Sequence, residues 1–463
     1  MMFNDLETTI AAIATPAGVG GVAVVRLSGP HSWAVTKALM QHPKRLADAG
    51  RVVVDWLVDT RDGQVLDQVV LLPFRAPNSY TGQDVVEIQT HGGRALVQLV
   101  LQRCLAAGAT LAHAGEFTHR AMVCGRLNLT QTESVLDLIH AQGERMVKLA
   151  AHNMHQRTLA GLLERYWQAI QTIQADMVAH IDFPDEVDEP DRGVLQCRLK
   201  ETLADVQVQL ALNHRSQPIR DGLRVALGGA PNAGKSSLFN RLLQSERAIV
   251  TPQAGTTRDT LTETMLVAGV PVTLVDTAGL RTSTDDIEQQ GVARARHAMA
   301  ESALTLIVAD LTQPVPVETW ALLEQAAPIL WVWHKVDLID CAGAGPVDAS
   351  RLDSRLEGVE QCLVSSHTGQ GIEAVLDWIG QQLDTLPDIG ELGYLLSQRQ
   401  IRQLEAVAVE LQGAVDALAQ PRLPLDLATV PLTNALLLLQ ELLGRDASEA
   451  VLDTVYARFC VGK

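Results

Sequence analysis

The sequence predicts a multidomain protein of the α/β and α classes, because two α/β segments alternate with two helical segments. The chain has 463 residues, about three times a typical ~150-residue domain, and 47% of them are hydrophobic. Short β-branched runs and glycine-rich turns occupy residues 1–124 and 218–384. Apolar residues at helical spacing occupy 125–217 and 385–463. The simplest arrangement is an N-terminal α/β domain followed by one helical domain in two halves, with a second α/β domain inserted between them.

The first two segments are predicted from a change of pattern near Gly125. Before it, the runs 22–25 and 52–54 are typical strands of a compact α/β domain. After it, Thr130 and Glu133 have the spacing of a capping box, and a long helical segment follows. Its apolar positions are Leu159, Leu163, Tyr166, Ile170, Ile173, Met177 and Ile181. We interpret the acidic, proline-containing stretch 182–191 as a solvated loop.

The inserted segment predicts a parallel sheet with flanking crossover helices. Its strands are predicted at 272–275, 305–308 and 329–332, and helical stretches alternate with them. Helical periodicity resumes after residue 398, and its apolar positions are Ile401, Leu404, Ala408, Leu411, Val415 and Leu418.

The charge balance disfavours nonspecific adhesion to nucleic acid or to anionic lipid. The chain has 37 Lys and Arg against 54 Asp and Glu, a formal net charge of -17. A nucleic-acid substrate would therefore dock on a local basic patch or on a surface shared with a partner. Six cysteines without a CxxC pair argue against a zinc site or a disulfide framework and suit a reducing cytosol. No signal peptide and no apolar run of ~18 residues is present, so we expect a cytoplasmic protein that does not enter a membrane.

Residues Gly229–Ser236 fit the phosphate-binding pattern GxxxxGK[ST], between an apolar run and a predicted helix. Glycines let backbone N–H groups converge on phosphate, Lys235 neutralises the terminal phosphates and Ser236 can bind Mg²⁺. The alternative is a glycine-rich turn with a solvated lysine. We predict that the nucleotide contacts Asn232, Ala233, Gly234, Lys235, Ser236 and Ser237.

Two further motifs predict the rest of a GTPase site. Asp276, Thr277, Ala278 and Gly279 follow an apolar strand, where Asp276 can hold the Mg²⁺ shell and the Gly279 amide can meet a γ-phosphate. The polar loop Gly255–Asp259 contains Gly255, Thr256 and Thr257, and the Thr257 hydroxyl would bind Mg²⁺ only with triphosphate present.

Guanine recognition is predicted at His334–Asp337, where GTPases usually carry NKxD. Lys335 and Asp337 are kept, but His334 replaces the asparagine, which costs ~1–2 kcal/mol of affinity if histidine cannot supply the lost hydrogen bond. Ser365, Ser366 and His367 are expected to supply the last contacts to guanine.

The residue that orients the attacking water has one candidate in the sequence. Leu280 stands where many GTPases have glutamine, and an aliphatic side chain cannot orient water. Glu288 is the nearest candidate, with a solvated loop acid as the alternative.

The chain resembles the MnmE (TrmE) family of tRNA-modification GTPases essentially from end to end. The stretches that carry the resemblance are 14–29, 77–93, 115–134, 181–186, 229–237, 255–259, 276–280 and the terminal FCVGK at 459–463.

The resemblance implies ligands for each α/β domain. The N-terminal domain would dimerise and bind 5-formyl- or methylene-tetrahydrofolate through Arg26, Glu87, Arg126 and Lys463, with Arg126 where the family often has lysine. The GTPase domain would be stimulated by K⁺ bound at Asn232, Thr251, Gln253 and Thr256, with Thr251 also near the nucleotide. Glu288 is similar in place to the glutamate that positions the attacking water.

The resemblance also implies the reaction. A homodimer would join a partner similar to MnmG (GidA), which carries FAD and uses NADH, in a heterotetramer that adds an aminomethyl or carboxymethylaminomethyl group to C5 of the wobble uridine of certain tRNAs. GTP hydrolysis would be coupled to dimerisation of the GTPase domains. Cys460 could act on the uracil as nucleophile or base, or it could be a small buried hydrophobe.

Two other functions stay open at this point. A regulatory GTPase switch in ribosome or RNA assembly would need neither the N-terminal domain nor the tail. A degenerate paralogue is suggested by His334 and Gln83 and would bind GTP weakly until asparagine replaced His334.

Overall fold

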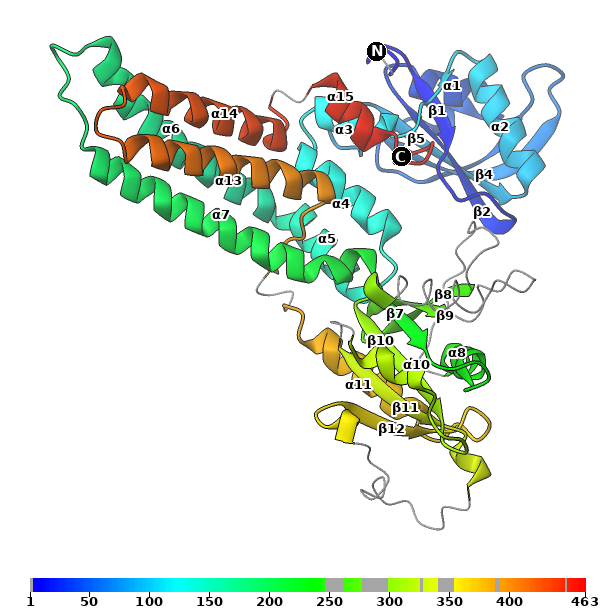
Figure 1. Ribbon diagram of the computed structural model, residues 1–463. Helices are drawn as coiled ribbons and strands as arrows, with labels where there is room; N and C mark the ends of the chain where they lie inside the picture. The colour runs from blue at the N-terminus through cyan, green and yellow to red at the C-terminus, as the bar shows by residue number, and fades with distance from the viewer. Residues whose placement is uncertain are drawn as a thin grey trace, which may run out of the picture. The chain divides into compact units, whose positions relative to one another are not determined.

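The computed structural model describes most of the chain and divides it into two compact units (Figure 1). The first unit comprises residues 1–139, 153–207 and 396–463, and the second comprises 140–152 and 208–395. The described ranges are 3–245, 261–276, 299–324, 328–339, 354–387, 392–445 and 448–463.

The first unit contains a six-stranded sheet in the order β3-β4-β5-β2-β1-β6. Its neighbours pair antiparallel, except that β1 and β6 pair parallel. Apolar side chains on alternate strand positions pack under α1 and α2, which makes this part the α/β domain that the sequence predicts. The bounds are β1 Ile10–Ile13, β2 Gly20–Ser28, β3 Val53–Val58, β4 Val65–Phe74, β5 Val85–Gly92, β6 Thr110–Leu111, α1 Ser32–Ala38, α2 Arg94–Ala106 and α3 Glu116–Val123.

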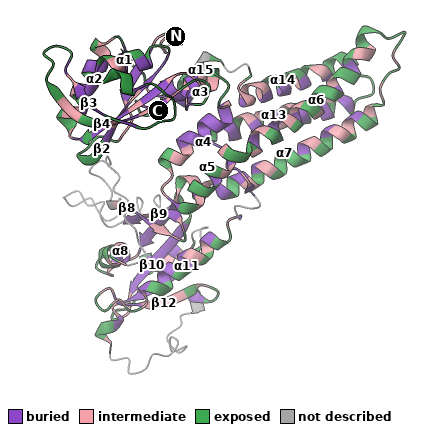
Figure 2. Cartoon of the chain, turned by 180° about the vertical axis from the view of Figure 1, so that it is seen from behind, coloured by how far each residue is buried: buried purple, intermediate pink, exposed green. Residues whose placement is uncertain are grey.

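The helices of the first unit come from both sides of the inserted segment. Helix α6 packs against α14, and α14 packs against α13, so segments far apart in sequence lie side by side (Figure 1). Buried and exposed residues alternate around each of these helices (Figure 2). The predicted helical domain in two halves is therefore confirmed. The bounds are α4 Leu129–His140, α5 Glu144–Gln156, α6 Thr158–Asp182, α7 Arg192–Asp221, α13 Gln398–Leu418, α14 Leu425–Leu443 and α15 Glu449–Tyr456.

Glu133 ties the two halves together instead of capping its own helix. Its carboxylate, in a residue only 8% exposed, accepts hydrogen bonds from Arg399, at 2.9 and 3.1 Å, and from Gln400. The start of α4 is capped by Asn128, whose Oδ1 accepts from the backbone N–H of Gln131 at 2.8 Å. The expected Thr130–Glu133 capping box is thus wrong, and the motif occurs at Ser397 and Gln400 of α13.

The second unit contains a six-stranded sheet in the order β12-β11-β10-β7-β9-β8, parallel except for the antiparallel edge strand β8. Helices α8 and α11 pack on one face, and α10 with its following 3₁₀ turn lies by the other. The predicted parallel sheet with flanking helices is confirmed. The bounds are β7 Leu223–Gly228, β8 Leu261–Val267, β9 Val270–Asp276, β10 Leu304–Asp310, β11 Ile329–His334, β12 Glu360–Val364, α8 Lys235–Leu243, α10 Val317–Trp320 and α11 Ile372–Asp384.

Parallel strands bring their carboxyl ends to one edge of the sheet. The motif residues after β7, β11 and β12, and Asp276 at the end of β9, therefore lie at one edge of the sheet. Across the described ranges, none of the helices combines the length and apolar character that a bilayer crossing requires.

Candidate nucleotide and folate sites

The loop between β7 and α8 has the backbone of a phosphate-binding loop. Gly229 and Gly234 adopt φ values of 135° and 107°, which favour glycine. A Cβ atom added at Gly229 would lie 2.1 Å from the carbonyl oxygen of Val308. One added at Gly234 would lie 2.2 Å from Nδ1 of His334. Asn232 also has a left-handed backbone, with φ 62°. The loop is therefore close-packed, and its N–H groups lead into the start of α8.

Lys235 and Ser236 begin α8 and face two different partners. The Lys235 ammonium, in a residue 6% exposed, donates to the carbonyl oxygens of Gly229 and Ala230 at 2.8 and 2.7 Å. Ser236 Oγ donates to Asp276 Oδ2 at 2.8 Å, and Asp276 is fully buried at the end of β9. The Lys235 side chain thus lies over the loop, and beside it the Ser236 hydroxyl is hydrogen-bonded to the Asp276 carboxylate.

The end of β11 carries the three residues predicted to face guanine. Lys335 has φ 65° and donates to Asp310 Oδ2 at 2.7 Å. Asp337 Oδ1 accepts from Ser365 Oγ at 2.6 Å, and this hydrogen bond lowers the pKa of the Asp337 carboxyl. The Asp337 carboxylate is therefore ionised at neutral pH and is held by the loop after β12.

His334 links this loop to the phosphate-binding loop. Its Nε2 lies 2.7 Å from Ser366 Oγ, and its Nδ1 lies against Gly234. Burial, together with the positive charge of Lys335, lowers the pKa of the His334 imidazole. A neutral imidazole therefore lies between the two loops, with Ser365 beside it and His367 exposed.

Several predicted residues lie outside the described ranges, so the structure places neither the water-positioning residue nor most of the K⁺ ligands. Ser237 is described and exposed in α8. The predicted residues outside the described ranges are Thr251, Gln253, Gly255, Thr256, Thr257, Thr277, Ala278, Gly279 and Glu288.

The first unit brings the predicted folate residues together around the β2–β5 pair. Arg26 and Glu87 are cross-strand partners, and the Arg26 guanidinium donates to Glu87 Oε1 at 2.9 and 2.8 Å. The Arg26 guanidinium also lies over the rings of Tyr80 and Phe117, 5.4 and 5.7 Å from their centroids. The pair is held rigidly and only partly exposed.

A cavity of about 390 Å³ opens beside this pair. It contains both Glu87 and Arg126, with Tyr80 and Phe74 as aromatic walls. A carboxylate, a guanidinium and two rings are the groups that a flat, polar heterocycle with an anionic tail would need.

The C-terminal tail reaches the same place, as the family resemblance implied for Lys463. Arg26 Nη1 donates to the Gly462 carbonyl oxygen at 3.3 Å, and Val461 forms a β-bridge with Ala114. Burial and the charge of Arg26 lower the pKa of the Lys463 ammonium. Cys460 is exposed, so the interpretation of a buried hydrophobe is wrong.

Gln83 and Tyr80 were not assigned roles from the sequence. Gln83 Oε1 accepts from Arg120 at 2.9 Å and its Nε2 donates to the Leu6 carbonyl oxygen at 2.8 Å. Tyr80 Oη lies 2.8 Å from Thr118 Oγ1. Gln83 therefore has a structural role, since it holds the N-terminal segment and Arg120 together.

Two family models match the chain in succession. The model described as the GTP-binding protein TrmE N-terminus matches residues 9–126. The MnmE helical domain model matches residues 129–460. This chain belongs to the MnmE family.

Curated relatives match over nearly the whole length of this MnmE family member. A protein named tRNA modification GTPase MnmE from Chloroflexus aurantiacus is 41% identical, over 99% of this chain and 100% of the relative. Relatives with the same name from Symbiobacterium thermophilum and Thermotoga maritima are 38% and 34% identical, over 99% and 98% of this chain and 100% of each relative. Among solved structures, the G domain of the FeoB iron transporter of T. maritima is 23% identical over 35% of this chain and 98% of that chain, with a TM-score of 0.25.

Proposed function

We propose that this MnmE family member is a GTP hydrolase that acts in tRNA modification. It would add an aminomethyl or carboxymethylaminomethyl group to C5 of the wobble uridine of certain tRNAs, with a folate one-carbon unit. The observation that carries the proposal is that Lys235, Ser236, Asp276 and Asp337 lie at the carboxyl edge of one parallel sheet. Family membership and the names of the curated relatives support the tRNA step.

The described residues fit Mg²⁺ and a triphosphate. Ser236 Oγ and Asp276 Oδ2 are hard oxygen donors 2.8 Å apart, which Mg²⁺ prefers. We assign Ser236 to the metal and Asp276 to its surrounding shell, with Thr257 as a further ligand. The Lys235 ammonium would exchange the carbonyls of Gly229 and Ala230 for phosphate oxygens. These residues would neutralise the charge that develops in hydrolysis.

Guanine would be recognised at the end of β11. Asp337, whose carboxylate accepts a hydrogen bond from Ser365, would accept hydrogen bonds from the N–H edge of the base, and Lys335 would pack along the ring. Ser366 and His367 would complete the pocket. His334 would act by holding the two loops together through Ser366 and Gly234 instead of contacting the base.

Hydrolysis would be stimulated by K⁺ and coupled to dimerisation of the GTPase domains. We assign Asn232, Thr251, Gln253 and Thr256 to K⁺, because the family resemblance implies them. Asn232 is exposed in the phosphate-binding loop, so its side chain is accessible to a cation. A monovalent cation beside the phosphates supplies positive charge where the transition state needs it. Glu288 would position the attacking water.

The first unit would hold 5-formyl- or methylene-tetrahydrofolate. Glu87 in the cavity can accept the N–H edge of a pterin, while Arg126 offers a positive charge for the glutamate tail. Arg26 would orient Glu87, and Lys463 would enter with the tail that Arg26 holds. The exposed Cys460 would act on the uracil ring.

A second protein would supply the redox chemistry. We propose a partner similar to MnmG (GidA), with bound FAD and with NADH as reductant, in a heterotetramer with a homodimer of this chain in the cytoplasm. The net charge of -17 supports a tRNA surface shared with that partner.

Deletion of residues 459–463 tests the proposal. The truncated protein should hydrolyse GTP at the normal rate, while wobble-uridine modification in cells is lost. Unchanged modification would instead favour a regulatory switch without chemistry of its own.

A further inference from the structure

The hairpin β8–β9 joins the nucleotide site to helix α5. At one end, Asp276 of β9 accepts the hydrogen bond from Ser236. At the other end, Ala268 and Gly269 form a two-residue turn with φ values of 48° and 74°. Strand β9 pairs with β7 on one side and β8 on the other, and most of its residues are buried. A strand packed this closely moves as one body, because interiors have low compressibility.

The turn of this hairpin packs closely against Gly143, which precedes α5. A Cβ on Gly143 would lie 2.2 Å from the Gly269 carbonyl oxygen and 3.2 Å from Pro271 Cδ. The backbone N–H of Arg145 donates to the same carbonyl oxygen at 3.4 Å. A displacement of the turn toward α5 is therefore passed on, because there is no space to absorb it.

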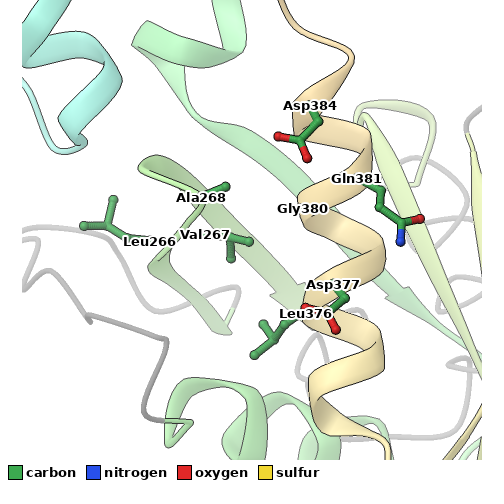
Figure 3. Close-up of a pocket in the computed structure, with 8 residues that line it drawn as sticks. All are labelled: Leu266, Val267, Ala268, Leu376, Asp377, Gly380, Gln381 and Asp384. Atoms are coloured by element: carbon green, nitrogen blue, oxygen red, sulfur yellow. The ribbon is translucent and has the colours of Figure 1, made fainter.

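Arg145 also fastens α5 to the end of α11. Its guanidinium donates to the Leu383 carbonyl oxygen at 3.1 Å and to Asp384 Oδ1 at 3.2 Å. A hollow of about 440 Å³ is lined by the end of β8 with Ala268 and by residues 376–384 of α11 (Figure 3). Open space therefore lies beside the turn on the side of α11, while α5 has hydrogen bonds to both elements.

Residues 144–152 of helix α5 belong to the second unit, as the hairpin does. There Met146 and Leu149 are buried with Ile219 of α7.

We propose that the β8–β9 hairpin is a lever that carries the state of the nucleotide site to α5, with Gly143 and Arg145 as its coupling residues. The proposal rests on the proposed function, since Mg²⁺ and GTP would bind at Ser236, whose hydroxyl is hydrogen-bonded to Asp276 at the end of β9. A shift of β9 on binding would reach α5 at Gly269. Gly143 and Arg145 are positioning residues and touch no substrate.

Hydrogen–deuterium exchange on the full-length protein tests the lever. Peptides covering 144–156 and 262–276 are compared with and without a non-hydrolysable GTP analogue in Mg²⁺ and K⁺. We expect the analogue to change exchange in both segments of the wild type by about threefold or more. In Gly143→Ala and Arg145→Ala, the response of 262–276 should remain and that of 144–156 should be lost.

Matched controls separate coupling from general damage. Gly161→Ala changes a glycine with space around its Cβ, and Lys148→Ala removes the exposed partner of Glu144 on the same helix. Both controls should keep the response of 144–156. The two activities should respond differently to the coupling variants. In Gly143→Ala and Arg145→Ala, GTP turnover should stay within about twofold of wild type, while tRNA modification should be at least about tenfold lower.

The lever is overturned if wild-type α5 does not respond to the bound analogue, or if both coupling variants keep the full response. If the circular dichroism spectrum shows that Gly143→Ala does not fold, the exchange of Arg145→Ala alone tests the lever. Failure of the wild type to bind GTP contradicts the proposed function instead, so the two failures are distinguishable.

Discussion

His334 is the residue at which this chain departs most clearly from the usual guanine-binding sequence. The structure shows why a histidine is accepted, because the ring fills the space beside Gly234 and reaches Ser366. The sequence predicted the site from residue types that bind phosphate and guanine. It could not predict the contact of His334 with Gly234, because these residues are a hundred positions apart in the chain. The same holds for the buried Glu116–Arg120 pair and its bond to Gln83.

The lowered pKa of His334 predicts that acid destabilises the second unit. Folding favours the neutral imidazole, so between the lowered folded pKa and the ordinary value of about 6.5 the unfolded chain binds more protons. The free energy of unfolding should therefore fall as pH falls through this window. Thermal melts from pH 7.5 to 5.5 should show a steeper loss in wild type than in His334→Asn. Equal slopes would show that His334 is not the group responsible.

Glu87→Gln should weaken binding of 5-formyl-tetrahydrofolate by about 10–100-fold, the value of a hydrogen bond to a charged group. The substitution removes the charge that would face the pterin and leaves Arg26 without its partner. Equilibrium titration measures the affinity, with GTP binding as an internal standard. Asp67→Asn, on the neighbouring strand and paired with exposed His91, is the control. Equal losses in both variants would contradict the assignment.

At the scale of elements, the periodicity of apolar residues was sufficient to predict most strands and helices. Helix α6 buries six of its seven predicted apolar positions, and Ile181 in its last turn is 37% exposed. The N-cap of α4 was missed because Asn128 and Thr130 are both capping residues, and only the tertiary bonds of Glu133 decide between them. No local signal shows that residues 140–152 group with the GTPase sheet.

Glu133→Ala should lower the free energy of unfolding by about 3 kcal/mol, because it leaves Arg399 and Gln400 without their carboxylate in a mostly buried site. Glu164→Ala, which removes the partly exposed partner of Arg445, should cost less than about 1 kcal/mol. Urea denaturation measures both. If the two variants are equally stable, Glu133 does not join the halves of the helical domain.

At the scale of the whole molecule, the assignment of Asn232 predicts a cation-dependent rate. GTP turnover in KCl should exceed that in NaCl at matched ionic strength by about tenfold or more, since a positive charge beside the phosphates lowers the barrier by about 1.4 kcal/mol or more. Asn232→Ala should abolish the difference. Equal rates in the two salts with wild-type protein would remove the K⁺ site from the account.

We propose that GTP hydrolysis at the Ser236–Asp276 site drives the modification of tRNA. The most direct measurement is mass spectrometry of tRNA nucleosides from cells that lack the endogenous activity and carry either wild type or Asp276→Asn. We predict that wild type restores the modified wobble uridine and that Asp276→Asn does not, although it accumulates to the same level. Restoration by both proteins, or by neither, would contradict the central claim.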